Sequence, residues 1–214
     1  MTVTEAIIKR NSIRAYLPKP IPQEVFTEIF TAASRSPSWA NTQPWEVFVA
    51  SGDALTRIKA GFKEATANKQ VASPDLARPG EWSDDAKRRT ATIGAAMQRD
   101  CGDAMSQFGE LNSNMYNAPS VVYICVDKKH GHWSLYDIGA YSQSLILAAL
   151  EKGLGTIQSA MSVLNCDVIR KELQIPDNLN IAIGIAIGYP DPDNKINNLH
   201  TERDDLANVV RFFN

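Results

Sequence analysis

The sequence lacks the segments that cross membranes or direct secretion. It has no uninterrupted apolar run of about 18 residues, the length that a membrane-spanning helix requires. Residues 1–5 lack the basic segment and the apolar stretch of a signal peptide. We therefore expect a chain that has no membrane partner and that works in the cytoplasm.

Cysteine and histidine are scarce. The 3 cysteines, Cys101, Cys125 and Cys166, are odd in number and widely spaced, which suits a reducing compartment better than a disulfide framework. The 3 histidines share no metal-ligand spacing with a cysteine. The sequence therefore predicts no zinc site.

An excess of positive charge is also missing. The formal net charge is -2 and the isoelectric point is about 5.9. Nucleic acids and anionic membranes need a basic surface on their partners, so neither is expected as a main partner. The apolar content of 44% and the charged content of 21% are typical of a soluble globular protein.

Short apolar runs alternate with helical patterns along the chain. Strands are predicted at about 46–50, 121–126 and 181–188, with a short strand and turn at 155–161 and helices between the strands. A chain of 214 residues fits one large domain or two small ones. We expect an α+β fold over residues 1–214, organised as a single domain in which helices flank one sheet.

The composition changes in the middle of the chain. Between residues 63 and 85, polar residues and prolines break any periodicity. A charged helical pattern follows over residues 84–109, and Gly94 and Gly102 are expected to interrupt it. Residues 63–115 are therefore interpreted as a surface insertion, which would be suited to act as a lid.

The N-terminal region places several cations close together. Thr2 and Glu5 have the spacing of a capping box, and the helix that they begin leads to Arg10, Ser12 and Arg14. Forked guanidinium donors beside a hydroxyl would suit an anion such as a phosphate. A solvated basic helix end fits the same residues, and it complements the helix dipole. These residues alone leave both interpretations open.

A nearly apolar helical pattern covers residues 138–150 and predicts a buried central helix, which Gly153 would end in a left-handed conformation. Gln143 is the polar exception in this pattern. A buried amide must find partners, because an unsatisfied one costs about 1–3 kcal/mol. Gln143 would either bond to a neighbouring loop backbone or help to hold a buried ligand.

Residues 37–45 form a stretch that suits neither a helix nor a regular strand. Two prolines, two tryptophans and several hydrogen-bonding side chains lie within it. Taken alone, the stretch is interpreted as a structured connection between a helix and a strand.

Together, these segments resemble the FMN-dependent nitroreductases. The similarity spans nearly the whole chain, and residues 63–115 correspond to the variable part of that family. The motifs that carry the resemblance are Arg10-Asn11-Ser12-Ile13-Arg14, Pro37-Ser38-Trp39-Ala40-Asn41-Thr42-Gln43-Pro44-Trp45, Gly153-Leu154-Gly155-Thr156, Gly188-Tyr189-Pro190-Asp191-Pro192 and Thr201-Glu202-Arg203.

The resemblance implies a central, mostly antiparallel sheet and an intertwined homodimer with two FMN sites at the subunit interface. The arginines would bind the phosphate, the ribityl chain and the pyrimidine edge, and residues 37–41 would reach the partner's flavin. Residues 157–161 would lie against the isoalloxazine edge. The expected cofactor-binding residues are Arg10, Asn11, Ser12, Arg14, Pro37, Ser38, Trp39, Asn41, Gln143, Ile157, Gln158, Ser159, Ala160, Met161 and Arg203.

The resemblance also implies a reaction. Hydride would pass from NADH or NADPH to FMN, and then in a ping-pong sequence to a small electron-poor acceptor such as a nitroaromatic or a quinone. The flavin would carry the chemistry, so no catalytic side chain and no metal are expected. The alternatives are a dehalogenase or enoate-type reductase of the same fold, and a flavin-binding redox protein without physiological turnover.

Overall fold

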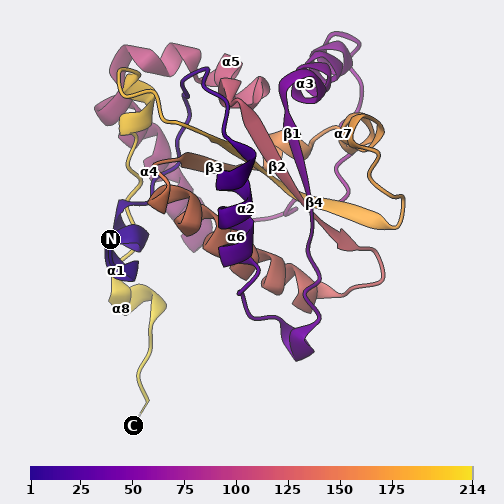
Figure 1. Ribbon diagram of the computed structural model, residues 1–214. Helices are drawn as coiled ribbons and strands as arrows, with labels where there is room; N and C mark the ends of the chain where they lie inside the picture. The colour runs from indigo at the N-terminus through magenta and orange to yellow at the C-terminus, as the bar shows by residue number, and fades with distance from the viewer. Residues whose placement is uncertain (214) are drawn as a thin grey trace.

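A computed structural model describes residues 1–213 and places one antiparallel sheet at the centre of the protein (Figure 1). Its strands are β1 (Glu46–Ser51), β2 (Ser120–Asp127), β3 (Gly155–Ser159) and β4 (Leu179–Gly188). They lie in the order β1-β2-β4-β3, and every neighbouring pair is antiparallel. The expected α+β class, with helices flanking a mostly antiparallel sheet, is confirmed.

Helices cover both faces of the sheet and extend beyond its ends (Figure 1). The α-helices are α1 (Val3–Lys9), α2 (Gln23–Ala33), α3 (Gly52–Ala67), α4 (Asp84–Cys101), α5 (Phe108–Ser113), α6 (His132–Glu151), α7 (Cys166–Leu173) and α8 (Leu206–Val209). Short 3₁₀ turns are η1 (Trp39–Asn41), η2 (Gly102–Gln107), η3 (Met115–Asn117), η4 (Ala160–Val163) and η5 (Lys195–Asn198).

The two faces of β2 carry two separate apolar cores, because successive side chains of a strand point to opposite faces. Val121, Tyr123 and Cys125 belong to the core that includes α3, α4 and α7. The alternate residues of the strand, such as Val122 and Ile124, pack with α2 and α6. A strand that is buried on both faces explains why its sequence is continuously apolar.

A close contact between backbone segments places the N-terminal arginines beside the edge strand β3. The Ile13 amide donates to the carbonyl of Thr156 at 3.0 Å, and Ser12 bridges to the same residue. Gly155 makes this approach possible, because a Cβ on it would lie 2.5 Å from Cγ1 of Ile13. The segment that follows α1 is thereby fixed along the end of the sheet.

Two helix predictions need correction. Gly94 does not interrupt α4, which continues to Cys101, whereas Gly102 does end it with a φ of 52°. Gly94 has open space around it, so the helix loses only the modest propensity difference between glycine and alanine. Over the predicted range 138–150, α6 is not buried all round, since Gly139 and Gln143 are exposed.

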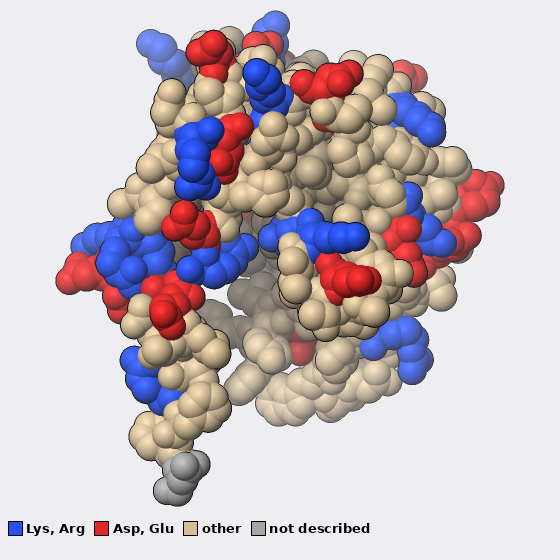
Figure 2. Space-filling model, turned by 90° about the vertical axis from the view of Figure 1, so that its left-hand side faces the viewer, with Lys and Arg blue, Asp and Glu red and all other residues tan. Residues whose placement is uncertain are grey.

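The C-terminal segment runs along the outside of α4 and then leaves the body of the protein (Figure 1). Lysine and arginine side chains alternate with aspartate and glutamate where this tail departs (Figure 2). Phe212 and Phe213 are 84% and 92% exposed, so the apolar tail finds no surface within its own chain. Among residues 1–213, no helix is both long enough and apolar enough to span a bilayer.

Candidate functional site

The most polar large cavity brings together residues from opposite ends of the chain. Its volume is about 490 Å³, and both Arg10 and Arg203 contribute to its wall. The cavity is lined by Ile7, Arg10, Ser12, Gln143, Ile146, Thr156, Ile157, Gln158 and Arg203. Two arginines beside a hydroxyl form an anion site of the kind that binds phosphate groups in a bidentate manner.

Arg14 follows Ser12 by two residues but does not itself line this cavity, and its side chain is partly buried. One terminal nitrogen, Nη1, donates to the Ser12 carbonyl at 2.9 Å. The Nε atom is buried and has no hydrogen-bond partner among residues 1–213. Burial lowers the pKa of this guanidinium, as expected when a cation loses water without gaining an anion. An orphaned cationic donor of this kind indicates a place for a ligand acceptor.

The residues after β3 form a tight turn beside the same strand. The Ser159 hydroxyl caps η4 by accepting from the Ser162 amide at 3.3 Å. Ile157 and Ser159 are buried, whereas Gln158 and Ala160 are exposed, and Met161 is 37% exposed. Ile157 and Gln158 line the cavity, whereas Ser159, Ala160 and Met161 lie outside its lining.

The loop that contains Trp39 is held in an unusual conformation. Ala40, Asn41 and Gln43 all have positive φ angles, which non-glycine residues rarely adopt. The loop is fixed by Ser38, whose hydroxyl accepts from the Gln43 amide at 2.9 Å, and by an Asp137 carboxylate oxygen 3.2 Å from the Trp39 amide. Strain that is held in place by such bonds is typical of functional segments.

This loop does not line the cavity of Arg10 in the same chain. Pro37, Ser38 and Trp39 instead contribute to an apolar hollow of about 410 Å³ with Trp133, Tyr136 and Asp137. The Trp39 and Trp133 rings meet edge to face, with centroids 5.9 Å apart. Trp39 is 67% exposed, so it does not belong to the core of its own chain.

The remaining expected site residues divide into two groups. Gln143 is exposed and lines the cavity, and no bond from its amide to a loop backbone occurs among residues 1–213. The Asn11 amide is occupied, since it donates to the carbonyls of Asn197 and Leu199 at 3.2 and 2.9 Å. Asn11 therefore holds the C-terminal loop in place, and Asn41 is exposed at the tip of its loop.

Sequence reasoning missed Asn197, which organises the arginine segment. Its Oδ1 accepts from the amides of Arg14 and Ala15 at 2.8 and 3.0 Å. Its Nδ2 donates to the carbonyls of Ala15 and Asp191 at 2.9 and 3.0 Å. The residue lies in a polar loop with several asparagines, so nothing in the local pattern distinguished it.

Acidic, cysteine and histidine side chains do not gather into a metal site. Over residues 1–213, no three of them are close enough to share an ion. Cys101, Cys125 and Cys166 are all buried, and none of them is in a disulfide. The arrangement is therefore one of cationic and neutral hydrogen-bond donors around a polar cavity.

Comparison with known proteins identifies relatives of this chain. A family model described as the nitroreductase family matches residues 7–189. The nitroreductase NfnB of Mycolicibacterium smegmatis is 29% identical over 215 residues, covering 97% of this chain and 92% of that protein. The 4-nitrobenzoate reductase of Pseudomonas putida is 28% identical, covering 96% of this chain and 93% of that one.

A solved structure has the same architecture. It is the FMN-dependent nitroreductase NfnB from Mycobacterium smegmatis in complex with NADPH, which superimposes with a TM-score of 0.89. The two chains are 27% identical, and the alignment covers 100% of each. The similarity therefore extends over the whole fold, including residues 63–115.

Proposed function

This chain belongs to the nitroreductase family, and from that premise we propose that it is an FMN-dependent oxidoreductase. It takes reducing equivalents from NADH or NADPH and passes them to a small electron-poor acceptor, of which nitroaromatics and quinones are the main classes. The similar protein from Pseudomonas putida is a 4-nitrobenzoate reductase, which supports a nitroaromatic as the first acceptor to test.

The observation that carries the proposal is the cavity shared by Arg10 and Arg203. Residues from both ends of the chain converge there on one polar hollow, which also contains Ser12 and Gln158. The two guanidinium groups suit the phosphate of FMN, and the hydroxyl and amide suit a polyol chain. A solvated basic helix end would not require a second arginine from the far end of the sequence.

The buried polar atoms near the cavity fit the same cofactor. The orphaned Nε of Arg14 needs an acceptor, and the carbonyl oxygens of a flavin pyrimidine ring are acceptors of that kind. The positive charge of Arg14 would also stabilise negative charge that develops on this ring. When bound, FMN supplies the hydride-accepting and hydride-donating chemistry, while the protein binds it and sets its electrostatics.

The chain's own residues then have separate tasks. Arg10 and Arg203 would hold the phosphate of FMN, and Arg14 would donate to its ring system. Backbone amides of the turn at Ala160 and Met161 would donate to the edge of the ring, which any residue except proline can do. No side chain is assigned as a general acid or base, since solvent can provide protons.

We propose further that two copies of the chain complete each site. The loop carrying Trp39 and Asn41 is exposed, yet it does not line the cavity of its own chain. In a twofold dimer, a surface patch meets the partner at an equivalent place on both subunits. The loop of one subunit would therefore cover the flavin that is bound to the cavity of the other.

The direct test uses the purified full-length protein. It should be yellow or take up FMN with a characteristic flavin spectrum, and NADH or NADPH should bleach that spectrum without oxygen. Adding 4-nitrobenzoate or a quinone should restore the oxidised spectrum faster than oxygen does. The proposal would be refuted if the protein were still colourless after incubation with excess FMN and removal of the unbound flavin. Reoxidation by oxygen alone would instead favour a flavin-binding protein without turnover of organic acceptors.

A further inference from the structure

The short segment around Arg203 alternates in the direction of its side chains. Arg203 lines the polar cavity with Arg10. Its neighbours Glu202 and Asp204 instead contact arginines of α4. These contacts direct Glu202 and Asp204 towards α4 and Arg203 towards the cavity.

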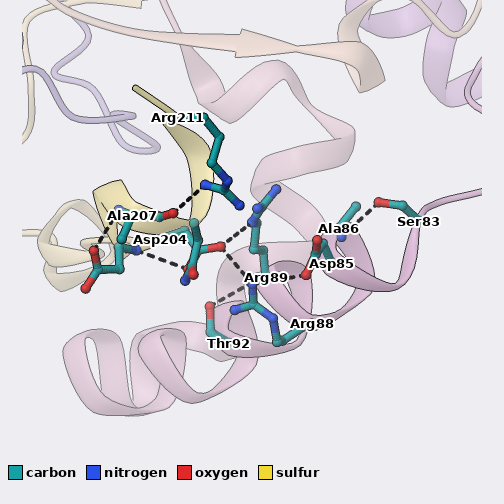
Figure 3. Close-up of polar contacts among 11 residues, drawn as sticks. Ser83, Asp85, Ala86, Arg88, Arg89, Thr92, Asp204, Ala207 and Arg211 are labelled. Atoms are coloured by element: carbon teal, nitrogen blue, oxygen red, sulfur yellow. Dashed lines mark hydrogen bonds and ion pairs between the residues drawn. The ribbon is translucent and has the colours of Figure 1, made fainter. Parts of the chain in front are cut away.

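Asp204 makes the strongest of these contacts (Figure 3). Its Oδ2 atom accepts from Nη2 of Arg88 and from Nε of Arg89, both at 2.7 Å. Its Oδ1 atom accepts from the side-chain amide of Asn208 at 3.0 Å. Hydrogen bonds from Arg88, Asn208 and Arg89 hold the pKa of Asp204 far below its usual value.

A second contact fixes the segment on the N-terminal side. Arg99 pairs with Asp100 at 2.7 Å and reaches Glu202 at 3.3 Å and the His200 carbonyl at 3.3 Å. The Asp100 carboxylate also accepts from the His200 amide at 3.0 Å. The segment is therefore tied to α4 on both sides of Arg203.

Arg203 itself has no such anchor. Its Nη1 atom donates only to groups of Thr201 and Glu202 in its own segment. Over residues 1–213, no carboxylate lies within ion-pair distance of its guanidinium. The direction of Arg203 is consequently set by the backbone around it, and that backbone is set by α4.

We infer that Arg88, Arg89 and Asp204 form a clamp that presents Arg203 to the phosphate of the bound cofactor. This inference rests on the proposed function, since it assigns positioning residues to the same FMN site. The clamp restricts Arg203 before the cofactor binds, so less conformational entropy is lost on binding. Such preorganisation increases affinity without adding a contact. It also gives α4, within residues 63–115, a role in cofactor retention.

The clamp can be tested through the affinity for two flavins. Asp204→Asn removes the charge and keeps the shape, and Kd for FMN would be measured from flavin fluorescence on full-length protein. We expect FMN binding to weaken roughly threefold to tenfold, the range that two lost ion pairs would produce. Riboflavin lacks the phosphate, so its affinity should not change. Asp84→Asn, on an exposed pair of the same helix, is the matched control and should change neither affinity.

A double-variant cycle separates positioning from general stability. If Asp204 acts through Arg203, then Asp204→Asn should have no further effect on FMN affinity in an Arg203→Ala background. Asp204→Glu, which restores the charge, should recover part of the lost affinity, and Arg88→Gln should imitate Asp204→Asn. Equal FMN affinities in the wild type, Asp204→Asn and Arg88→Gln would overturn the inference. An equal loss of riboflavin affinity in these two variants would also overturn it. A wild-type protein that binds no FMN would instead overturn the proposed function.

Discussion

Asp75 and Arg170 form a partly buried ion pair that ties the middle of the chain to the end of α7. The Oδ2 atom of Asp75 accepts from Nη2 of Arg170 and from the Ile181 amide, both at 2.7 Å. Arg170 also donates to the carbonyls of Pro176 and Leu179 at 2.7 and 2.9 Å. The Asp75 carboxylate thus joins residues 63–115 to the start of β4, although the segment that contains Asp75 has no regular secondary structure.

We expect Asp75→Ala to lower the free energy of unfolding by about 2–4 kcal/mol, because it leaves Arg170 enclosed without a counter-charge. Urea denaturation would measure the change. Glu172→Ala is the control, since its partner Arg57 is largely exposed and such pairs contribute about 0–1 kcal/mol. Equal effects of the two substitutions would show that enclosure does not strengthen the Asp75 pair.

The strands were predictable because their physical signal is local. A run such as residues 121–126 is apolar at every position and must be buried on both faces. The capping box of Thr2 and Glu5 is likewise present as its spacing predicts. The pairing of β2 with β4, and the β1-β2-β4-β3 order, depend on contacts distant in sequence that no local pattern encodes.

The cavity was only partly predictable for the same reason. Only the resemblance to a family indicates Arg10 and Arg203 as site residues, since nothing near either residue in the sequence indicates that they meet. The exposure of Gln143 could not be foreseen, because the apolar pattern around it is that of a buried helix. The contacts of Asp75 and Asp204 were also beyond sequence reasoning, since each depends on a partner about a hundred residues away.

A substitution at Gly155 should disturb both the fold and the cofactor site. A Cβ there would overlap the side chain of Ile13, which lies between Ser12 and Arg14. We expect Gly155→Ala to cost about 1–3 kcal/mol of stability and to weaken FMN binding. Gly139→Ala is the matched control: this helical glycine has open space around it, so alanine should stabilise by about 0.5–1 kcal/mol. Unchanged FMN affinity in Gly155→Ala would contradict the positioning role of this contact.

Arg14→Met should have opposite effects on the apoprotein and on flavin binding. Without a ligand, the buried Nε of Arg14 lacks a partner, and such a donor costs about 1–3 kcal/mol. Removing it should raise the melting temperature of the apoprotein by a few degrees, since about 1 kcal/mol corresponds to roughly 2–4 °C at this size.

The same substitution should reduce the additional stabilisation that FMN provides, because a charged donor to the ring is lost. Thermal melts with and without FMN would measure both effects, with the exposed Arg57→Met as control. A less stable apoprotein with unchanged FMN stabilisation would assign Arg14 to the fold and not to the site.

The buried thiols should make the protein sensitive to alkaline pH. Burial raises the pKa of Cys125 from about 9 to about 12, so the folded state favours the neutral thiol. The resulting stability is complete below pH 9, the pKa of the exposed thiol, and is lost as the pH rises from 9 towards 12. Each such thiol adds a slope of up to about 1.4 kcal/mol per pH unit in this window.

Urea denaturation between pH 8 and about pH 11 would therefore show a shallower decline for Cys125→Ala than for the wild type. Val121→Ala, which creates a cavity on the same face of β2 without removing a thiol, should keep the wild-type slope. Identical slopes in all three proteins would show that folding does not raise the pKa of Cys125.

The shared site predicts complementation between two defective variants. Arg10→Ala combined with Arg203→Ala removes the phosphate contacts, and Trp39→Ala combined with Asn41→Ala removes the exposed loop groups. Each homodimer would then have two impaired sites. After refolding of an equal mixture, half of the dimers would be mixed, and each mixed dimer would contain one intact site with arginines from one subunit and the loop from the other. Activity should therefore reach roughly one quarter of the wild-type value.

Mixing without refolding is the control and should give only the sum of the activities of the two variants. The same low sum after refolding would place the loop and the arginines at separate sites.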